Sequence, residues 1–303
     1  MKKFLEVKNL SVSFSEKVQR VFIVRDVSFS VFQGERIGLI GESGCGKTTL
    51  AHAMANLLPS YAQMKGSIYF ANEMIKQSEI AIIFQDPFLS LNPTMKIGKQ
   101  IQETFLFNGM KKRKNAKEKS IKLLNDVGLP EHIFSSYPHQ LSGGMCQRIM
   151  IAIALAKGPK ILLADEPTTA LDVIYGRQIL ELLKKIQKEK KMSVFLNTHD
   201  IGVISTFCDR LFVMYGGRIV EAGKMKDILI HPMHPYTRYL LDMKNAKEKK
   251  YFSSKKKEKG CPFSFCCPHV MDKCKHFFPK EIKEKTHRCH CFLYSKEKNN
   301  EKR

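Results

Sequence analysis

The sequence predicts an α/β protein built on a largely parallel sheet, with an α-helical insert and a small cysteine-rich C-terminal extension. Three observations predict this fold class. Short, continuous apolar runs recur along the 303 residues, as in strands that are buried on both faces of a parallel sheet. Between the second and third of these runs, apolar residues recur at helical spacing. After residue 241 the composition changes abruptly to lysine and then to cysteine.

The expected elements follow one another in a regular order. Residues 4–8 and 27–31 alternate apolar and polar side chains, as strands with one buried face do. Continuous apolar runs predict buried strands at 37–40, 80–84, 161–164, 194–196 and 211–214. Helical spacing within 97–127 predicts a helical insert at about 94–155, inside a domain of residues 1–242. A basic linker at 243–259, a cysteine-rich module at 260–293 and a polar tail at 294–303 complete the predicted organisation.

The bulk composition is that of a globular protein. Hydrophobic residues make up 43% of the chain and charged residues 26%. No apolar run approaches the roughly 20 residues that a membrane-spanning helix needs. The first residues alternate like a strand and lack the apolar run of a signal peptide, so we expect a cytoplasmic protein with an intact N-terminus.

Two lysine-rich runs, at 111–119 and 244–259, carry half of the formal net charge of +22. The first run has a net charge of +5 and the second of +6. Neither run interleaves aromatic residues as a stacking platform for single-stranded nucleic acid does. A solvated lysine-rich surface is therefore favoured over a nucleic-acid site, and a weak attraction to anionic membranes is a third interpretation.

Residues 41–48 read G-E-S-G-C-G-K-T and match the P-loop pattern G-x-x-x-x-G-K-[ST] directly after an expected strand. Glycines let the backbone N–H groups face phosphate oxygens, and the next helix points its positive end at the same anion. We expect Lys47 to reach the β- and γ-phosphates of ATP and Thr48 to bind Mg²⁺ through its hydroxyl. The residues expected to bind the nucleotide here are Gly41, Ser43, Gly44, Gly46, Lys47, Thr48 and Thr49.

The expected strand at 161–164 ends in two adjacent acids, Asp165 and Glu166. Ligands of α/β sheets bind at the carboxyl ends of the strands. Asp165 is expected in the Mg²⁺ shell, and Glu166 is expected to polarise the attacking water as a general base. A capping pair of acids would look similar, so the prediction depends on the P-loop.

Residues 141–148 read L-S-G-G-M-C-Q-R and resemble the signature motif of ABC ATPases. A serine hydroxyl and glycine N–H groups at a helix start form a second anion cradle. The motif lies in the helical insert, and the resemblance implies that it closes over the ATP of a second, head-to-tail subunit. Position 146 is Cys where peptide importers usually carry Arg, which leaves the packing of this helix open. The residues that match the motif are Ser142, Gly143, Gly144 and Gln147.

Other positions resemble the same family. Gln85 is similar to the Q-loop glutamine that senses Mg²⁺ and the attacking water, and His199 to the switch histidine at the γ-phosphate. Asp172, in the segment 170–172, is similar to the D-loop residue at the dimer seam. For the aromatic that stacks on adenine, Phe14 is the first choice and Phe22 the second. The resemblance thus implies Glu166, His199 and Gln85 as catalytic residues and Thr48, Gln85 and Asp165 as Mg²⁺ ligands.

Residues 85–93 and 234–237, which read Q-D-P-F-L-S-L-N-P and H-P-Y-T, resemble the dipeptide, oligopeptide and nickel importer group of this family. The resemblance covers about residues 1–293. It implies a RecA-like P-loop NTPase core with an antiparallel β subdomain. It also implies an ATP- and Mg²⁺-dependent ATPase that energises import of dipeptides or oligopeptides, with nickel or a nickel chelate as the alternative.

The resemblance also implies partners. They are a second ABC ATPase subunit, identical or related, two transmembrane permease subunits and, indirectly, an extracytoplasmic substrate-binding protein. The expected location is the cytoplasmic face of the inner membrane. Nucleic acid is not an expected partner.

Six of the nine cysteines lie between residues 261 and 291, which in a cytosolic chain suggests metal rather than disulfides. Four cysteines like these are reported to ligate an iron–sulfur cluster in the importer group, so the resemblance implies a [4Fe–4S] cluster with structural zinc as the alternative. No pair has the C-x₂-C spacing of zinc ribbons, which favours the cluster. Reduced thiols in a tail are the third interpretation, and Cys266 and Cys291 are left over. The implied ligands are Cys261, Cys267, Cys274 and Cys289.

Two other functions are alternatives to the transporter. Nucleic-acid-linked ABC ATPases usually carry two cassettes or a long coiled-coil insertion, whereas this sequence has one cassette and a short insert. A regulatory module that only binds ATP would not need Lys47, Asp165, Glu166 and His199 together.

Overall fold

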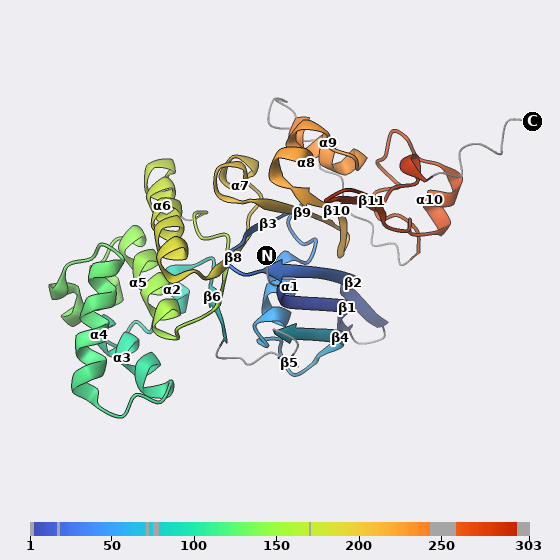
Figure 1. The fold of residues 1–303 in the computed structure, drawn as a ribbon. Coiled ribbons are helices and arrows are strands. Elements are labelled where there is room, and N and C mark those ends of the chain that lie inside the picture. Colours follow the sequence, from blue (N-terminus) through green and yellow to red (C-terminus); the bar gives the residue numbers. More distant parts are fainter. Residues whose placement is uncertain are drawn as a thin grey trace, which may run out of the picture.

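The structure, a computed structural model, describes residues 3–16, 19–70, 73–74, 79–169, 171–242 and 259–295. Within these residues there are two sheets (Figure 1): one of four strands in the order β2-β1-β4-β5, and one of eight in the order β11-β12-β10-β9-β3-β8-β7-β6. The strands are β1 (Lys3–Glu16), β2 (Gln19–Phe32), β3 (Arg36–Ile40), β4 (Ala62–Phe70), β5 (Glu73–Met74), β6 (Ile80–Ile83), β7 (Ile161–Asp165), β8 (Ser193–Asn197), β9 (Arg210–Tyr215), β10 (Arg218–Lys224), β11 (Ile282–Glu284) and β12 (His287–Cys289).

The helices lie on both sides of the larger sheet and in an arm beyond its β6 edge (Figure 1). They are α1 (Lys47–Met54), α2 (Pro87–Ser90), α3 (Ile97–Phe107), α4 (Arg113–Asp126), α5 (Gly143–Ala156), α6 (Val173–Lys190), α7 (Ile201–Phe207), α8 (Met225–Ile230), α9 (Pro235–Asp242) and α10 (Asp272–His276).

The centre of the larger sheet is parallel, as the apolar runs predict. Strands β6, β7, β8, β3 and β9 pair in parallel register, and all five fall on predicted runs. Their side chains alternate between two cores. Leu163 belongs to the core shared with α1 and the smaller antiparallel sheet, and Leu162 to the core shared with α5 and α6. Both faces are therefore buried, which is why these strands show no polar alternation. The α/β prediction is confirmed.

Helices α3, α4 and α5 form the arm (Figure 1, green). The predicted helical spacing corresponds to burial, because Ile97, Ile101 and Leu124 are buried together with Ile149 of α5. The arm thus shares one buried core with β6 and β7, and its last helix ends at Ala156, one residue beyond the range predicted for the insert.

The C-terminal cysteine-rich segment, residues 259–295, joins the larger sheet directly. Strand β12 pairs antiparallel with β10, where Cys289 lies opposite Glu221, and β11 pairs with β12. The division into a linker, a module and a tail stays a prediction. Residues 243–258 of the predicted linker and 296–303 of the predicted tail lie outside the described residues, as does Ala170.

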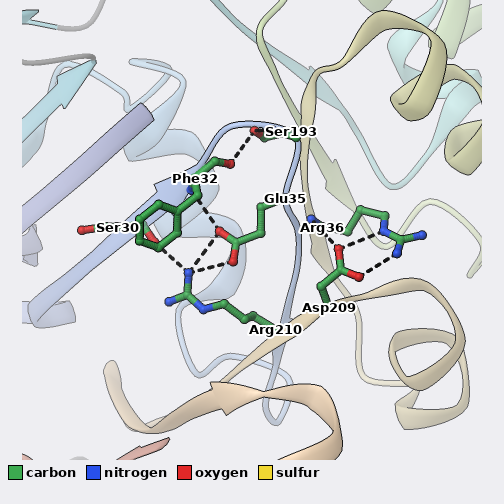
Figure 2. Close-up of polar contacts among 8 residues, drawn as sticks. Ser30, Phe32, Glu35, Arg36, Ser193, Asp209 and Arg210 are labelled. Carbon is green, nitrogen blue, oxygen red and sulfur yellow. Dashed lines mark hydrogen bonds and ion pairs between the residues drawn. The ribbon is translucent and has the colours of Figure 1, made fainter. Parts of the chain in front are cut away.

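Polar contacts hold the start of β3, the strand that leads into the P-loop. Figure 2 shows Arg210 of β9 donating to both carboxylate oxygens of Glu35, at 2.9 and 3.0 Å, and to the carbonyl of Ser30. Arg36 forms a second ion pair with Asp209, 2.6 Å between the nearest atoms. These charge pairs therefore join the start of β3 to the start of β9, at the end opposite the P-loop.

No helix of the described ranges is both long and apolar enough to cross a lipid bilayer.

Candidate nucleotide site

A cleft of about 860 Å³ opens where β3 and β7 end and α1 begins, a volume within the range of small-molecule sites. It gathers residues that are far apart in the sequence. Ten of its lining residues were predicted: Phe14, Ser43, Gly44, Gly46, Lys47, Thr48, Thr49, Gln85, Glu166 and His199. Two others, Ile23 and Thr169, were not predicted.

The P-loop backbone is packed too closely for any side chain at two glycines. Gly46 has φ of 108°, and a Cβ there would lie 2.8 Å from the carbonyl oxygen of Ile23. A Cβ on Gly41 would lie 2.2 Å from the carbonyl oxygen of Met214. Gly46 also precedes α1, and within the described chain no side chain caps this helix start. Its first N–H groups therefore face the cleft with no side-chain acceptor, as an anion site requires.

Lys47 lies at the wall of the cleft with only 6% of its surface exposed. Its ammonium group donates to the carbonyl oxygens of Gly41, at 2.8 Å, and of Glu42, at 3.0 Å. The positive charge is thus held by its own loop, within reach of phosphates bound there.

The Mg²⁺ prediction can be compared with the donor groups present. Asp165 is buried at the end of β7, and Asn197 donates one hydrogen bond to its carboxylate at 3.3 Å and another to the Lys47 carbonyl. Thr48 and Gln85 line the cleft, whereas Asp165 is not among its lining residues. One carboxylate, one hydroxyl and one amide oxygen form a hard donor set of the kind that Mg²⁺ shares with phosphates and water. The residues fit the ion.

Glu166 is held in an unusual backbone conformation. Its φ of 48° is left-handed, which is rare for a non-glycine residue and is often found at functional sites. Thr169 donates to one carboxylate oxygen at 2.8 Å, and the Nδ1 of His199 lies 3.1 Å from the other. Burial acts to raise the pKa of Glu166, but hydrogen bonds from Thr169 and His199 and the charge of Lys47 lower it below the usual value. The group is therefore ionised and able to accept a proton.

The aromatic prediction is compatible with the cleft. Phe14 lines it together with Ile23, and its ring centroid lies 5.9 Å from that of the exposed Tyr61. Phe22, the second choice, is not among the lining residues of the cleft.

The signature residues lie on the arm and do not line this cleft. Ser142 caps α5 by accepting the N–H of Met145, and Asp172 caps α6 by accepting two N–H groups. Gln147 is buried, and its side-chain nitrogen has no hydrogen-bond partner in the described part of the chain. Ser142, Gly143, Gly144, Gln147 and Asp172 are thus apart from the P-loop of their own chain, and their roles stay predictions.

Cys146, the departure in this motif, is completely buried, and its thiol lies 3.7 Å from the carbonyl oxygen of Pro138. Burial raises its pKa to about 11. The residue therefore acts as a packed apolar side chain beneath α5, facing away from the solvent side of that helix.

A second hollow, of about 440 Å³, lies along the arm between α2, α3 and α5. Its residues include Gln100, Phe107 and Ile153. Leu89 of α2 is 87% exposed and Phe107 is 93% exposed. Exposed apolar groups beside a hollow are typical of a surface that binds another protein.

The predicted metal site finds no support as the thiols stand. All nine cysteines are free, and in the described ranges no three Cys, His, Asp or Glu side chains form a group that could hold a metal ion. The thiols of the segment do interact. Burial raises the pKa of Cys261 to about 12 and of Cys291 to about 11, and their mutual proximity and that of Cys267 and Cys274 add to the rise. Burial also raises the pKa of Cys289, and the charge of Glu221 and the nearby thiols of Cys291 and Cys261 add to the rise.

Comparison with known families identifies two matches. The family model described as ABC transporter matches residues 24–169, and the model described as oligopeptide/dipeptide transporter, C-terminal region, matches residues 220–274.

Comparison with curated proteins gives relatives along nearly the whole chain. The dipeptide transport ATP-binding protein DppD of Bacillus subtilis (strain 168) is 42% identical and aligns with 97% of this chain and 95% of its own. The oligopeptide transport ATP-binding protein OppD of Salmonella typhimurium is 39% identical over 91% of this chain and 90% of its own.

Among solved structures, a dimeric ATP-binding cassette in a post-hydrolysis state, bound to ADP and Pi, matches with a TM-score of 0.64 and 28% identity. It covers 73% of this chain and 98% of its own. The cbiO1 protein of Clostridium perfringens, part of the ABC transporter complex cbiONQ, matches with a TM-score of 0.66 and 28% identity over 76% of this chain and 92% of its own.

Proposed function

The chain belongs to the ATP-binding proteins of ABC transporters, in the dipeptide and oligopeptide branch, and from this premise we propose that it hydrolyses ATP to energise an importer of dipeptides or oligopeptides. One observation supports this function most directly. The cleft gathers a phosphate-binding loop, two of the proposed Mg²⁺ donors, Thr48 and Gln85, and an ionised carboxylate whose two oxygens are both held.

In this proposal each residue of the cleft has a role in hydrolysis. The P-loop amides and Lys47 bind the phosphate chain and offset its charge, which is the main form of catalysis available to phosphoryl transfer. Glu166 accepts a proton from the attacking water, and the hydrogen bonds of Thr169 and His199 keep its carboxylate aimed and ionised. Gln85 faces the same cleft and orients the water. Mg²⁺, when bound by Thr48, Gln85 and Asp165, neutralises charge on the phosphates.

A second ATPase subunit completes the site in this proposal. Ser142, Gly143 and Gly144 form a helix start that does not line the cleft of their own chain, so we propose that they bind the nucleotide of a partner. The partner is a second copy or a related subunit. ATP then lies between two chains, and hydrolysis depends on their closure.

Two transmembrane permease subunits are the proposed membrane partners, on the cytoplasmic face of the membrane. The hollow of the arm, with Leu89 and Phe107 exposed beside it, is the surface where short permease helices would bind. Because this hollow is next to α2, which follows Gln85 directly, closure over ATP would reach the permease through that segment. An extracytoplasmic binding protein delivers the peptide.

Peptides are favoured over the alternatives. The relatives reported above are named for dipeptides and oligopeptides, whereas no described feature points to nickel. The lysine run at 111–119 forms most of the first half of α4, where its charged side chains are exposed, and it needs no nucleic-acid partner to explain it.

A metal at the C-terminal cysteines is proposed separately, as a [4Fe–4S] cluster or zinc. The proposed ligands are Cys261, Cys267, Cys274 and Cys289, and the burial of Cys261, Cys274 and Cys289 within one segment supports the proposal. Iron, sulfide and zinc analysis of anaerobically purified protein tests it. Protein without these elements would contradict it.

The ATPase proposal is tested with the assembled importer in proteoliposomes. Glu166→Gln should lower ATP hydrolysis and peptide uptake by at least about a hundredfold, because the base is lost while the shape of the site is kept. MgATP binding should be retained. The matched control is Glu181→Gln, an exposed acid on α6 outside the cleft, which should leave both activities unchanged.

Two results would overturn the proposal. Hydrolysis that persists in Glu166→Gln would remove the assigned base. Activity stimulated by nucleic acid and indifferent to the permease would favour the nucleic-acid-linked alternative.

A further inference from the structure

The P-loop makes one contact that the nucleotide does not explain. The N–H of Glu42 donates to the hydroxyl of Tyr236, 2.9 Å away, although the two residues are separated by 194 positions in the chain. Tyr236 is completely buried at the start of α9 and does not line the cleft. It therefore touches the loop from behind, on the side away from bound phosphates.

The peptide that Tyr236 holds is the one that positions Lys47. The carbonyl of Gly41 and the N–H of Glu42 belong to the same planar peptide unit and point in opposite directions. The carbonyl accepts the Lys47 ammonium at 2.8 Å, and the N–H donates to Tyr236. A rotation of this peptide would move both contacts together. The Tyr236 hydroxyl thus fixes the orientation of the Gly41–Glu42 peptide, whose carbonyl accepts the hydrogen bond from the Lys47 ammonium.

Tyr236 is itself fixed by the cysteine-rich segment. Its ring centroid lies 4.5 Å from that of Tyr215 and 5.4 Å from that of Phe263, and the last two rings meet edge to face. Phe263 is buried and stands two residues after Cys261. The C-terminal segment therefore forms part of the packing that holds the tyrosine in place.

The backbone of Tyr236 is anchored as firmly as its ring. The backbone N–H of Tyr236 donates to Nδ1 of the His234 ring. The backbone N–H of His234 in turn donates to the buried carboxylate of Glu221 at 2.7 Å. His287 of β12 lies 2.6 Å from the other oxygen of that carboxylate. A side chain locked from both ends can position another group precisely.

A second link joins the same two regions. The N–H of Gly217 donates to the Cys45 carbonyl of the P-loop at 3.0 Å. Pro262 packs against the adjacent Gly216, where a Cβ would lie only 2.5 Å from the proline ring.

From these contacts we infer that Tyr236 is a positioning residue of the nucleotide site, through which the cysteine-rich segment sets the P-loop peptide that holds Lys47. The inference rests on the proposed function. Tyr236 never contacts the nucleotide. It keeps the P-loop in its binding conformation before ATP arrives, which reduces the ordering needed on binding.

The test is equilibrium binding of MgATP to the full chain by a fluorescent nucleotide, with thermal melting measured beside it. Tyr236→Phe removes only the hydroxyl and should weaken MgATP binding about three- to tenfold, the range for one hydrogen bond. The matched control is Tyr294→Phe. It also removes a tyrosine hydroxyl, which is partly buried, donates to the Met233 carbonyl and accepts from Arg238. These contacts lie outside the P-loop, so binding should be unchanged.

A second variant tests the route. Phe263→Leu loosens the ring contact with Tyr236 and should weaken MgATP binding about twofold, with no further loss when combined with Tyr236→Phe. Additive losses in the double variant would show that the segment does not act through the tyrosine, and would overturn the inference.

The remaining outcomes are separable. The inference would be overturned if Tyr236→Phe bound MgATP as tightly as wild type. It would also be overturned if Tyr294→Phe weakened MgATP binding as much as Tyr236→Phe and both losses matched a lower melting temperature. A wild-type chain that binds no MgATP would instead overturn the proposed function.

Discussion

The nucleotide cleft and the cysteine-rich segment both bury reactive side chains, but they treat them in opposite ways. In the cleft, Glu166 is surrounded by groups that favour its charged form, so its pKa is lowered despite burial. In the segment, Cys261 and Cys291 are buried beside other thiols, and their pKa values rise. In the cleft, hydrogen bonds and opposite charges outweigh the effect of desolvation on the pKa. In the cysteine-rich segment, the neighbouring thiols add to it.

The difference shows that burial alone does not make a reactive site. A carboxylate with a hydroxyl donor, an imidazole and an ammonium nearby stays ionised and usable. A thiol among thiols stays protonated and inert unless a metal or a base takes its proton. By this measure the segment, as it stands, is a structural support for the cassette.

The largest expected effect on stability comes from breaking the ion pair between Glu35 and Arg210 at the start of β3. Glu35→Ala leaves the partly buried guanidinium of Arg210 without its bidentate acceptor and should lower the free energy of unfolding by about 3 kcal/mol. Chemical denaturation measures it. Asp209→Ala is the control: its side chain is 50% exposed, against 4% for Glu35, and the expected cost is about 1 kcal/mol or less. If both substitutions lowered the free energy of unfolding equally, burial would not explain the larger cost expected for Glu35→Ala.

A smaller effect should come from removing one group that keeps Glu166 ionised. Thr169→Val deletes a hydrogen bond that lowers the pKa of Glu166, while the burial that raises it remains. The pKa of Glu166 should therefore rise. When the pH is lowered, the variant should lose ATPase activity at a higher pH than wild type does. At pH 8 the two proteins should be similar. The pH profile of kcat for the assembled importer measures this, and an unshifted acid limb would contradict it.

The smallest effect concerns the thiols. Burial raises the pKa of all three thiols, but the half-buried Cys266 is more accessible than Cys261 and Cys291. Cys266 should therefore be alkylated by iodoacetamide before the other two. Below the pKa, their reaction should speed up about tenfold per pH unit. Mass spectrometry gives each rate. Equal rates would contradict the assignment of buried, protonated thiols, and protection that ends only with a chelator would support the metal proposal.

Much of the fold and site could be predicted because the signals are local. A buried parallel strand is a short apolar run, and β3, β7 and β8 each fall on one. The P-loop is a contiguous pattern, so its residues and the acids after β7 could be named from the sequence.

Other features have no local signal. Thr169 acts on Glu166 only because the left-handed backbone at the acid brings their side chains together. The three-residue strands β11 and β12 are too short for periodicity to register, so their pairing with β10 could not be seen. The contact of Tyr236 with the P-loop likewise depends on how distant elements pack.

The pairing of β12 with β10 has a consequence for how the protein is made. Residues 287–289 are among the last described residues to be synthesised, yet they cover an edge of the main sheet. Domains fold from the N-terminal end as translation proceeds. The edge of β10 that pairs with β12 therefore has no partner strand until β12 has been synthesised. A nascent chain interrupted before residue 287 would expose that edge, and unpaired edges invite other strands. Complete translation is thus itself a safeguard of this sheet against aggregation.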